Sequence, residues 1–296
     1  MIPLNSAVHL TRGNPAGTTA LFAHFAPSHR SFIGMVEKNA DQPALIGYVE
    51  VPSGIQSARL TFLLSNNGDL KAQLPYLLDG LVQQAGSLGA TNVTAELPEN
   101  HPAIDSFRRC GFSIYARQRI WHLPANIEKP KPNGGKWSDL TEMDRFYIQS
   151  LYQSLVPPIV QRVEGFCTST VQGLIFVDRG ERYGLVDCLY GLQGIFIQPY
   201  IHPEVEHTRN VLQQLMTELP SVFDRPVYIA VRSYQAWLEN DLRELGAEVS
   251  DTMVLMVKHM GLQTRMPEKE HIWQTLESGN AQPSTSTYQR MNHKLR

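Results

Sequence analysis

The chain has 296 residues, of which 42% are hydrophobic and 18% charged, and its formal net charge is −2 at pH 7. This composition predicts a globular core and, by length, either two domains or one large one. The near-neutral charge favours neither nucleic acid nor a membrane surface as a partner. The opening sequence MIPLNSAVHLTRGNPAG is not typical of a signal peptide, and no apolar run reaches the ~18 residues of a membrane span. Three separated cysteines, Cys110, Cys167 and Cys188, indicate a reducing, cytoplasmic compartment.

Six segments of the first half have the pattern of β-strands. They are residues 31–39, 43–51, 58–65, 92–97, 112–118 and 119–123. The turn-forming sequence NADQ joins the first two as a hairpin, and the third is apolar enough to lie centrally in a sheet. We therefore expect a sheet that begins with a hairpin.

Two helices are expected between these strands. The first spans residues 74–89, with Pro75 near its first turn and Gly89 beyond its end. Its apolar residues form one stripe: Leu74, Leu77, Leu78, Leu81, Val82 and Ala85. The second is the short segment NHPAIDSFRRCGF, residues 100–112. Strands and helices in alternation predict a parallel strand pair with crossovers, hence an α/β or α+β fold.

The chain divides at residues 126–137, where proline, lysine and glycine remove both periodicities. This predicts a linker between a first domain, 1–125, and a second domain, 138–260. Residues 261–296 are largely polar, and we expect them to form a flexible tail that is dispensable from about residue 283.

The second half repeats the element order of the first. Its matching segments are residues 194–201, 210–219, 226–231, 233–247 and 249–260. Leu77 and Val211 lie 134 residues apart, and Gly111 and Gly246 lie 135 apart, so helix and turn agree on one offset. This agreement predicts two copies of one fold.

The short helix of the first half carries a family motif. Its spacing resembles N-x-x-A-x-x-x-Y-x-x-x-G-F of the GNAT N-acetyltransferase superfamily. Asn100, Ala103, Gly111 and Phe112 match, and Phe107 stands where tyrosine is usual. With the element order, this motif makes the chain resemble a tandem GNAT protein, with each half a mixed β-sheet flanked by helices. The resemblance is good over residues 30–125 and looser over 160–260.

The resemblance implies that acetyl-CoA inserts between the strands 58–65 and 92–97. Its pantetheine arm would pair with the first strand, and its pyrophosphate would lie at the N-terminus of the helix 74–89, where free N–H groups attract an anion. The cofactor-binding residues implied in this way are Leu63, Leu64, Lys71, Ala72, Asn100 and Phe107.

The sequence departs from the family at the pyrophosphate loop, usually R/Q-x-x-G-x-G/A. Without a gap, the three positions hold Asp69, Ala72 and Leu74, followed by Pro75, which has no N–H. In the second half, no glycine occurs between Gly194 and Gly246. Both cofactor loops are therefore expected to be degenerate, and any acetyl-CoA binding is expected to be weak and to centre on the first half.

Catalytic residues stay unassigned at this level. Acetyl transfer needs a base for the amine and an acid for the departing thiolate, and Phe107 cannot supply the proton. Glu96 and Glu50 are candidate bases, although exposed strand-end carboxylates are the simpler interpretation. Tyr115 and Tyr234 are candidate acids, with packing aromatics that have a solvated hydroxyl as the alternative.

Three further patterns have simpler interpretations. Asn100 precedes HPAID, a pattern that predicts a helix N-cap, and a cofactor contact is the alternative. The segment HPEVEH, from His202 to His207, lacks the H-E-x-x-H spacing, so no metal site is expected. Residues 144–165 have the pattern of an amphipathic helix that runs to Pro157 and Pro158. In the family such a helix borders the acceptor cleft, and core packing is the simpler interpretation for most of these residues.

Two functions remain open. The first is a GNAT-type N-acetyltransferase that uses acetyl-CoA and a small-molecule amine acceptor, in the cytoplasm. The second is a catalytically inactive relative that serves as a ligand-sensing or structural module. Either function is compatible with a homodimer, and the sequence does not determine the oligomeric state. The degenerate loops favour the second function, and the family resemblance favours the first.

Overall fold

A computed structural model describes residues 1–13, 29–39, 42–65, 70–125, 127–128, 130, 135–166, 168, 171–219 and 225–260. The contacts gather Met1–Gly261 into one compact unit. The predicted tail, residues 261–296, lies outside the described residues. Across the ranges that are described, no helix is long and apolar enough to span a membrane.

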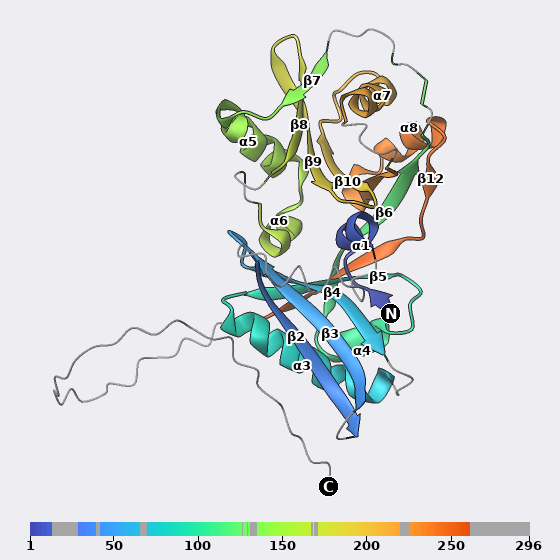
Figure 1. Cartoon of the computed structure of the whole chain (residues 1–296). Helices are drawn as coiled ribbons and strands as arrows, with labels where there is room; N and C mark the ends of the chain where they lie inside the picture. The colour runs from blue at the N-terminus through green and yellow to red at the C-terminus, as the bar shows by residue number, and fades with distance from the viewer. Residues whose placement is uncertain are drawn as a thin grey trace, which may run out of the picture. The chain divides into compact units, whose positions relative to one another are not determined.

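The first half consists of a sheet with helices α3 and α4 on one face and a short N-terminal segment (Figure 1). Its elements are β1 (Ile2–Pro3), α1 (Ser6–Arg12), β2 (His29–Asn39), β3 (Gln42–Pro52), β4 (Ser57–Ser65), α3 (Leu70–Ser87), β5 (Asn92–Pro98), α4 (Ile104–Arg109) and β6 (Ser113–Leu123).

The second half has the same succession after an inserted helical segment. Its elements are β7 (Lys136–Asp139), η1 (Glu142–Asp144), α5 (Arg145–Leu155), α6 (Pro158–Glu164), β8 (Gly173–Asp178), β9 (Glu181–Tyr190), β10 (Ile195–Ile201), α7 (Thr208–Glu218), β11 (Val227–Arg232), η2 (Ser233–Gln235), α8 (Leu238–Glu244), β12 (Glu248–Val249) and β13 (Met253–His259). β7 begins inside the range predicted as a linker, and the division into two domains there stays a prediction.

The two halves have the same strand order, as the repeat predicts. β2, β3 and β4 are antiparallel neighbours and β4 pairs with β5 in parallel. β8, β9 and β10 are likewise antiparallel, and β10 pairs with β11 in parallel. All these strands belong to one sheet, ordered β2-β3-β4-β5-β13-β6-β11-β10-β9-β8-β7. The mixed α/β fold and the repeat of strand order in the two halves are therefore confirmed.

The last strand of each half pairs with the other half. β6 lies between β13 and β11, and β13 lies between β5 and β6. The sequence predicted two strands over residues 112–118 and 119–123, and this was wrong: β6 is one continuous strand. β13, from the second half, lies between β5 and this strand.

The helix stripe predicted for α3 is confirmed. Leu74, Leu78 and Leu81 are fully buried against the sheet. Gly47 of β3 lies directly beneath, where an added Cβ would come within 2.7 Å of a Leu81 methyl group. The helix begins at Leu70, earlier than predicted, so Pro75 lies within the helix and not at its first turn.

Matching glycines end the last helix of each half. Gly111 and Gly246 have φ of 85° and 78°. The N–H of the residue after each glycine donates to the carbonyl five residues earlier, from Phe112 to Phe107 and from Ala247 to Leu242. This is the Schellman geometry of helix ends, and it supports the predicted offset.

Candidate functional site

The parallel strands of each half separate after a short paired stretch. β4 and β5 pair from Ser57 to Arg59 and then diverge. β10 and β11 pair from Ile195 to Ile197 and then diverge. We call these separations the first fork (residues 60–65 and 95–98) and the second fork (198–201 and 230–232). In β4 the register with β3 shifts by one residue at Thr61, and such a bulge increases local twist.

The first fork is filled by the start of the chain. β1 pairs antiparallel with β4, with Ile2 opposite Leu63. The N–H of Leu4 donates to the Thr61 carbonyl at 2.9 Å, and the Leu4 carbonyl accepts from the Glu96 N–H at 3.0 Å. Residues 2–4 therefore form a short strand between β4 and β5, along the edge where the resemblance implies the pantetheine arm.

In the described part of the chain, the second fork is bridged by side chains and not by backbone. The Gln198 amide donates to the Ala230 carbonyl at 3.2 Å, across from β10 to β11. The buried Gln235 amide donates to the Pro199 carbonyl at 2.7 Å. Two backbone carbonyls that face this fork therefore bond amide N–H groups of glutamine side chains.

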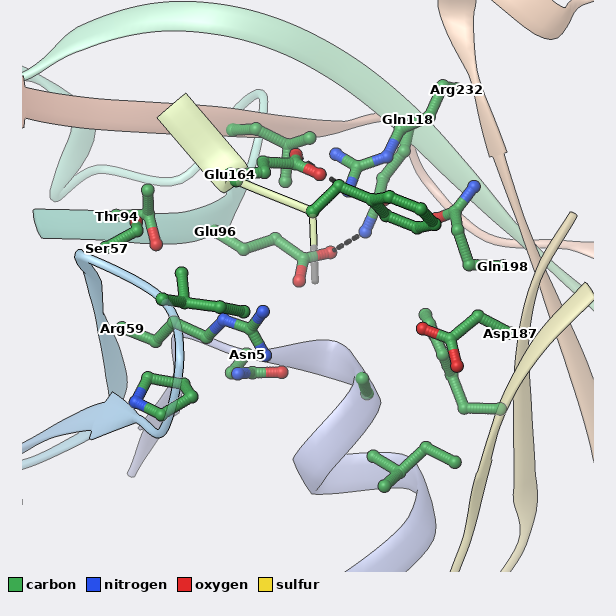
Figure 2. A pocket seen from close by; sticks show the side chains of 18 of the residues that line it. Asn5, Ser57, Arg59, Thr94, Glu96, Gln118, Glu164, Asp187, Gln198 and Arg232 are labelled. Carbon is green, nitrogen blue, oxygen red and sulfur yellow. Dashed lines mark hydrogen bonds and ion pairs between the residues drawn. The ribbon is translucent and has the colours of Figure 1, made fainter. Parts of the chain in front are cut away.

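A cavity of about 760 Å³ is lined by residues of both halves (Figure 2). The first half contributes Arg59, Glu96 and Gln118, and the second half Glu164, Asp187, Gln198, Tyr200 and Arg232; Asn5 of the N-terminal segment completes one side. Its volume is within the range of small-molecule sites.

Glu96 is a buried carboxylate that fixes the N-terminal segment. One oxygen accepts the Ser6 N–H at 2.9 Å, and the other accepts the Ser6 hydroxyl at 2.7 Å. The Gln118 side-chain amide also donates to the Glu96 carboxylate. The sequence-based view of Glu96 as an exposed strand-end carboxylate is wrong: its side chain holds α1 beside β5.

A second carboxylate forms a mostly buried ion pair. Glu164, the last residue of α6, lies 2.9 Å from a guanidinium nitrogen of Arg232. The Tyr115 hydroxyl donates to the same carboxylate at 2.8 Å. Burial, and then Glu164, raise the pKa of Tyr115 well above its usual value. The alternative of a solvated hydroxyl is therefore wrong for Tyr115, which stays protonated as a hydrogen-bond donor.

Asp187 of β9 lies opposite Gln198 in the sheet register, next to the second fork. Burial raises its pKa, and this effect is reduced by the N–H of Gln172, 3.2 Å from the carboxylate, and by the charge of Arg59. A carboxylate with a raised pKa in a cavity has the properties of a general base.

The six predicted cofactor residues do not come together. Leu63 and Phe107 are fully buried in the first core, where Phe107 packs edge-on to Phe112. Leu64 lies farther along β4, whereas Ala72 and Asn100 are exposed. The Lys71 side chain and Asp69 lie outside the described residues. None of the five side chains that can be placed lines the cavity, and their assignment to a cofactor stays a prediction.

Three other expectations need correction. Asn100 is not the N-cap of α4: the cap is Ala103, which has no side-chain bond, although its N–H donates to His101. Leu74 is a core residue and not part of a loop. The pattern 144–165 forms two helices, α5 and α6, separated at the proline pair.

The remaining candidates lie around the site. Glu50 is opposite Arg59 in the sheet register but does not line the cavity. Tyr234 packs with the tyrosine cluster near Arg232, and burial raises its pKa. Among the described residues, no three His, Cys, Asp or Glu side chains come close enough to hold a metal.

Asp187, Arg59, Glu164 and Arg232 were not singled out from the sequence. A signal existed for two of them: Asp187 interrupts the apolar strand LVDCLY, and Arg59 interrupts ARLTFLL. A charged residue on a largely buried strand is a better indication of a functional site than the apolar residues around it.

The fold is similar to solved acetyltransferase structures. A tandem GNAT protein from the clavulanic acid biosynthesis pathway matches with a TM-score of 0.51 and 16% identity, over 79% of this chain and 84% of its own. A GCN5-related N-acetyltransferase from Sphaerobacter thermophilus matches with a TM-score of 0.55 and 13% identity, over 82% and 86%. Another from Kribbella flavida matches with a TM-score of 0.52 and 13% identity, over 82% and 94%.

The sequence comparisons add no closer relative. No protein-family model matches, and no curated protein is similar in sequence. At these identities the structural likeness establishes the fold alone. The chain has the fold of GNAT acetyltransferases, in the tandem form.

Proposed function

We propose that the protein transfers an acetyl group from acetyl-CoA to a small amine, and that only the second half holds acetyl-CoA. The observation that carries this proposal is the difference between the forks. β1 occupies the first fork with backbone hydrogen bonds, whereas the hydrogen bonds across the second fork among the described residues come from the side chains of Gln198 and Gln235. Side chains rotate out of a groove far more readily than a paired strand leaves a sheet.

The second fork offers bonding groups suited to the pantetheine arm. The Pro199 and Ala230 carbonyls accept amide N–H groups of glutamines, so amides of the cofactor fit the same acceptors. Each glutamine bond given up costs ~1 kcal/mol, which a new amide bond offsets. Pro199 has no N–H, so β10 offers the pantetheine arm one hydrogen-bond donor fewer than a strand without proline would.

The N-terminus of α7 fits the phosphates. No side chain caps it, and the preceding residue, His207, has a left-handed conformation with φ of 57°. Free N–H groups and the positive end of the helix attract an anion without requiring glycine. Arg209, in the first turn, is partly exposed and adds a positive charge there, and one of its guanidinium nitrogens lies 3.5 Å from a carboxylate oxygen of Glu244.

The cavity residues supply the proton transfers. The reaction forms an N–C bond to the acetyl carbon and breaks its C–S bond. Asp187 accepts the proton that the amine loses. Tyr200, on β10 in the cavity wall, gives a proton to the departing thiolate.

A second candidate function is ligand binding without transfer. The glutamine bonds across the second fork favour it, because both carbonyls are already satisfied in the free protein. In that case the cavity binds a small polar molecule, and the protein acts as a sensing or structural module.

Titration calorimetry with acetyl-CoA separates the two functions. Arg209→Glu should weaken binding by about tenfold, since reversing a surface charge near phosphates changes the interaction by ~1–2 kcal/mol. Arg109→Glu, an equally simple change on the exposed surface of α4 in the first half, should leave it unchanged. Asp187→Asn should retain binding and lose transfer. Absence of wild-type binding up to ~1 mM acetyl-CoA would reject transfer and leave the second function.

A further inference from the structure

We infer that Arg59 binds a carboxylate group of the acceptor, so that the acceptor is a small amino carboxylate, such as an amino acid, and not a simple amine. This inference rests on the proposed function for the transfer step, but its binding part stands alone. Arg59 lies in the cavity wall with its guanidinium directed inward (Figure 2). It makes no hydrogen bond or ion pair with any described residue, although it is only partly exposed.

The other charges in the cavity are largely accounted for. Glu96 is bonded by Ser6 and Gln118, and Glu164 is paired with Arg232. These groups therefore hold the structure together and are not open to a ligand without breaking existing bonds.

Arg232 cannot take the place of Arg59. Arg232 also lines the cavity, but its Nε and Nη1 atoms are buried from solvent and have no hydrogen-bond partner in the described part of the chain. Its remaining nitrogen is bonded to Glu164. Arg12 also lines the cavity, but it lies at the exposed end of α1, on the rim. Arg59 is the cavity cation that is both accessible and partly desolvated.

The usual structural role of such an arginine does not apply here. Glu50 lies opposite Arg59 on the neighbouring strand, the position from which a carboxylate would normally pair with it. No ion pair is formed between them within the described part of the chain. Arg59 is instead directed away toward the cavity.

Asp187 provides the complementary charge on the opposite side of the cavity (Figure 2). The two groups interact electrostatically: burial raises the pKa of Asp187, and the positive charge of Arg59 lowers it. A guanidinium binds a carboxylate with two hydrogen bonds, and a carboxylate binds an ammonium group. A ligand with a carboxylate at Arg59 and an amine at Asp187 would place the amine beside Gln198, at the second fork.

Ligand-observed NMR without acetyl-CoA tests the binding. The probes are glycine, β-alanine and L-lysine, with methylamine, ethylamine and cadaverine as the matched amines that lack the carboxylate. At least one amino carboxylate should bind at least tenfold more tightly than its amine. Arg59→Gln should weaken that binding by tenfold or more, Arg59→Lys should restore part of it, and Arg109→Gln should have no effect.

The outcomes separate this inference from the proposed function. Binding that depends on Arg59, without acetylation when acetyl-CoA is added, would support the inference and reject transfer. Equal binding of amines and amino carboxylates would overturn the inference. So would undiminished binding by Arg59→Gln, or no binding of any probe up to ~10 mM.

Discussion

The carbonyl oxygen of Leu4 accepts a hydrogen bond from the N–H of Glu96 at 3.0 Å, and this bond joins the N-terminus to β5. The N–H of Leu4 donates to the carbonyl of Thr61 in β4, so Leu4 is bonded on both sides. In the first half, N-terminal residues of the same chain therefore form hydrogen bonds with the strand edges at the fork. Such bonds are needed because buried backbone groups without partners are costly. The second half resolves the same problem with glutamine side chains, which leaves it the more adaptable of the two.

Leu4→Ala should destabilise the protein by about 3 kcal/mol, because a fully buried leucine leaves a cavity. Urea denaturation measures the loss. Leu192→Ala, at an exposed leucine, should change the free energy of unfolding by less than about 0.5 kcal/mol. A similar, small change in both variants would show that β1 does not dock as described.

Glu164→Gln should cost about 3 kcal/mol of unfolding free energy, because it leaves the buried guanidinium of Arg232 without its counter-charge. The control is Glu142→Gln, which removes an exposed pair with Arg145 and should cost less than about 0.5 kcal/mol. Equal costs in urea denaturation would contradict the structural role given to Glu164.

Local patterns predicted the order of elements well. The α3 stripe and the glycines Gly111 and Gly246 depend on residues close in sequence, and all appear where expected. The exchange of β6 and β13 could not be predicted in this way. A strand has the same alternating pattern whichever half it pairs with, so its partner is decided by contacts far apart in sequence.

The site was harder to predict for the same reason. β1 is two residues long and has no periodicity, yet it decides which fork is open. Glu96 was a candidate from the sequence, but its partner Ser6 is distant along the chain. Asp187 and Arg59 come from different halves, and only the fold places them in one cavity.

Gly111→Ala should destabilise the protein by about 1 kcal/mol, since alanine is strained at a φ of 85°. Gly86→Ala provides the contrast. Gly86 is exposed within α3, its φ is not positive, and an added Cβ would meet the Met260 sulfur at an ordinary 3.4 Å. This change should stabilise by about 0.5–1 kcal/mol. Thermal unfolding of both variants checks the opposite signs.

Asp187→Asn should stabilise the protein at neutral pH. Burial raises the folded-state pKa of Asp187 above its ordinary value of 3.8, so ionisation is less favourable in the folded state than in the unfolded one. Wild-type stability therefore falls as pH rises from 3.8 through the folded-state pKa, and the penalty is complete above it. Asparagine keeps the oxygen that accepts from Gln172 and has no charge to bury.

Urea denaturation of wild type and Asp187→Asn over a series from acid to neutral pH checks this. The two proteins should be nearly equal in stability at low pH, where Asp187 is neutral in both states, and the variant should gain steadily as pH rises. Asp251→Asn, at an exposed position, should show no such gain. A variant that loses stability toward neutral pH would mean that the Asp187 carboxylate is stabilised by its surroundings, and its role as a base poised for the amine would be rejected.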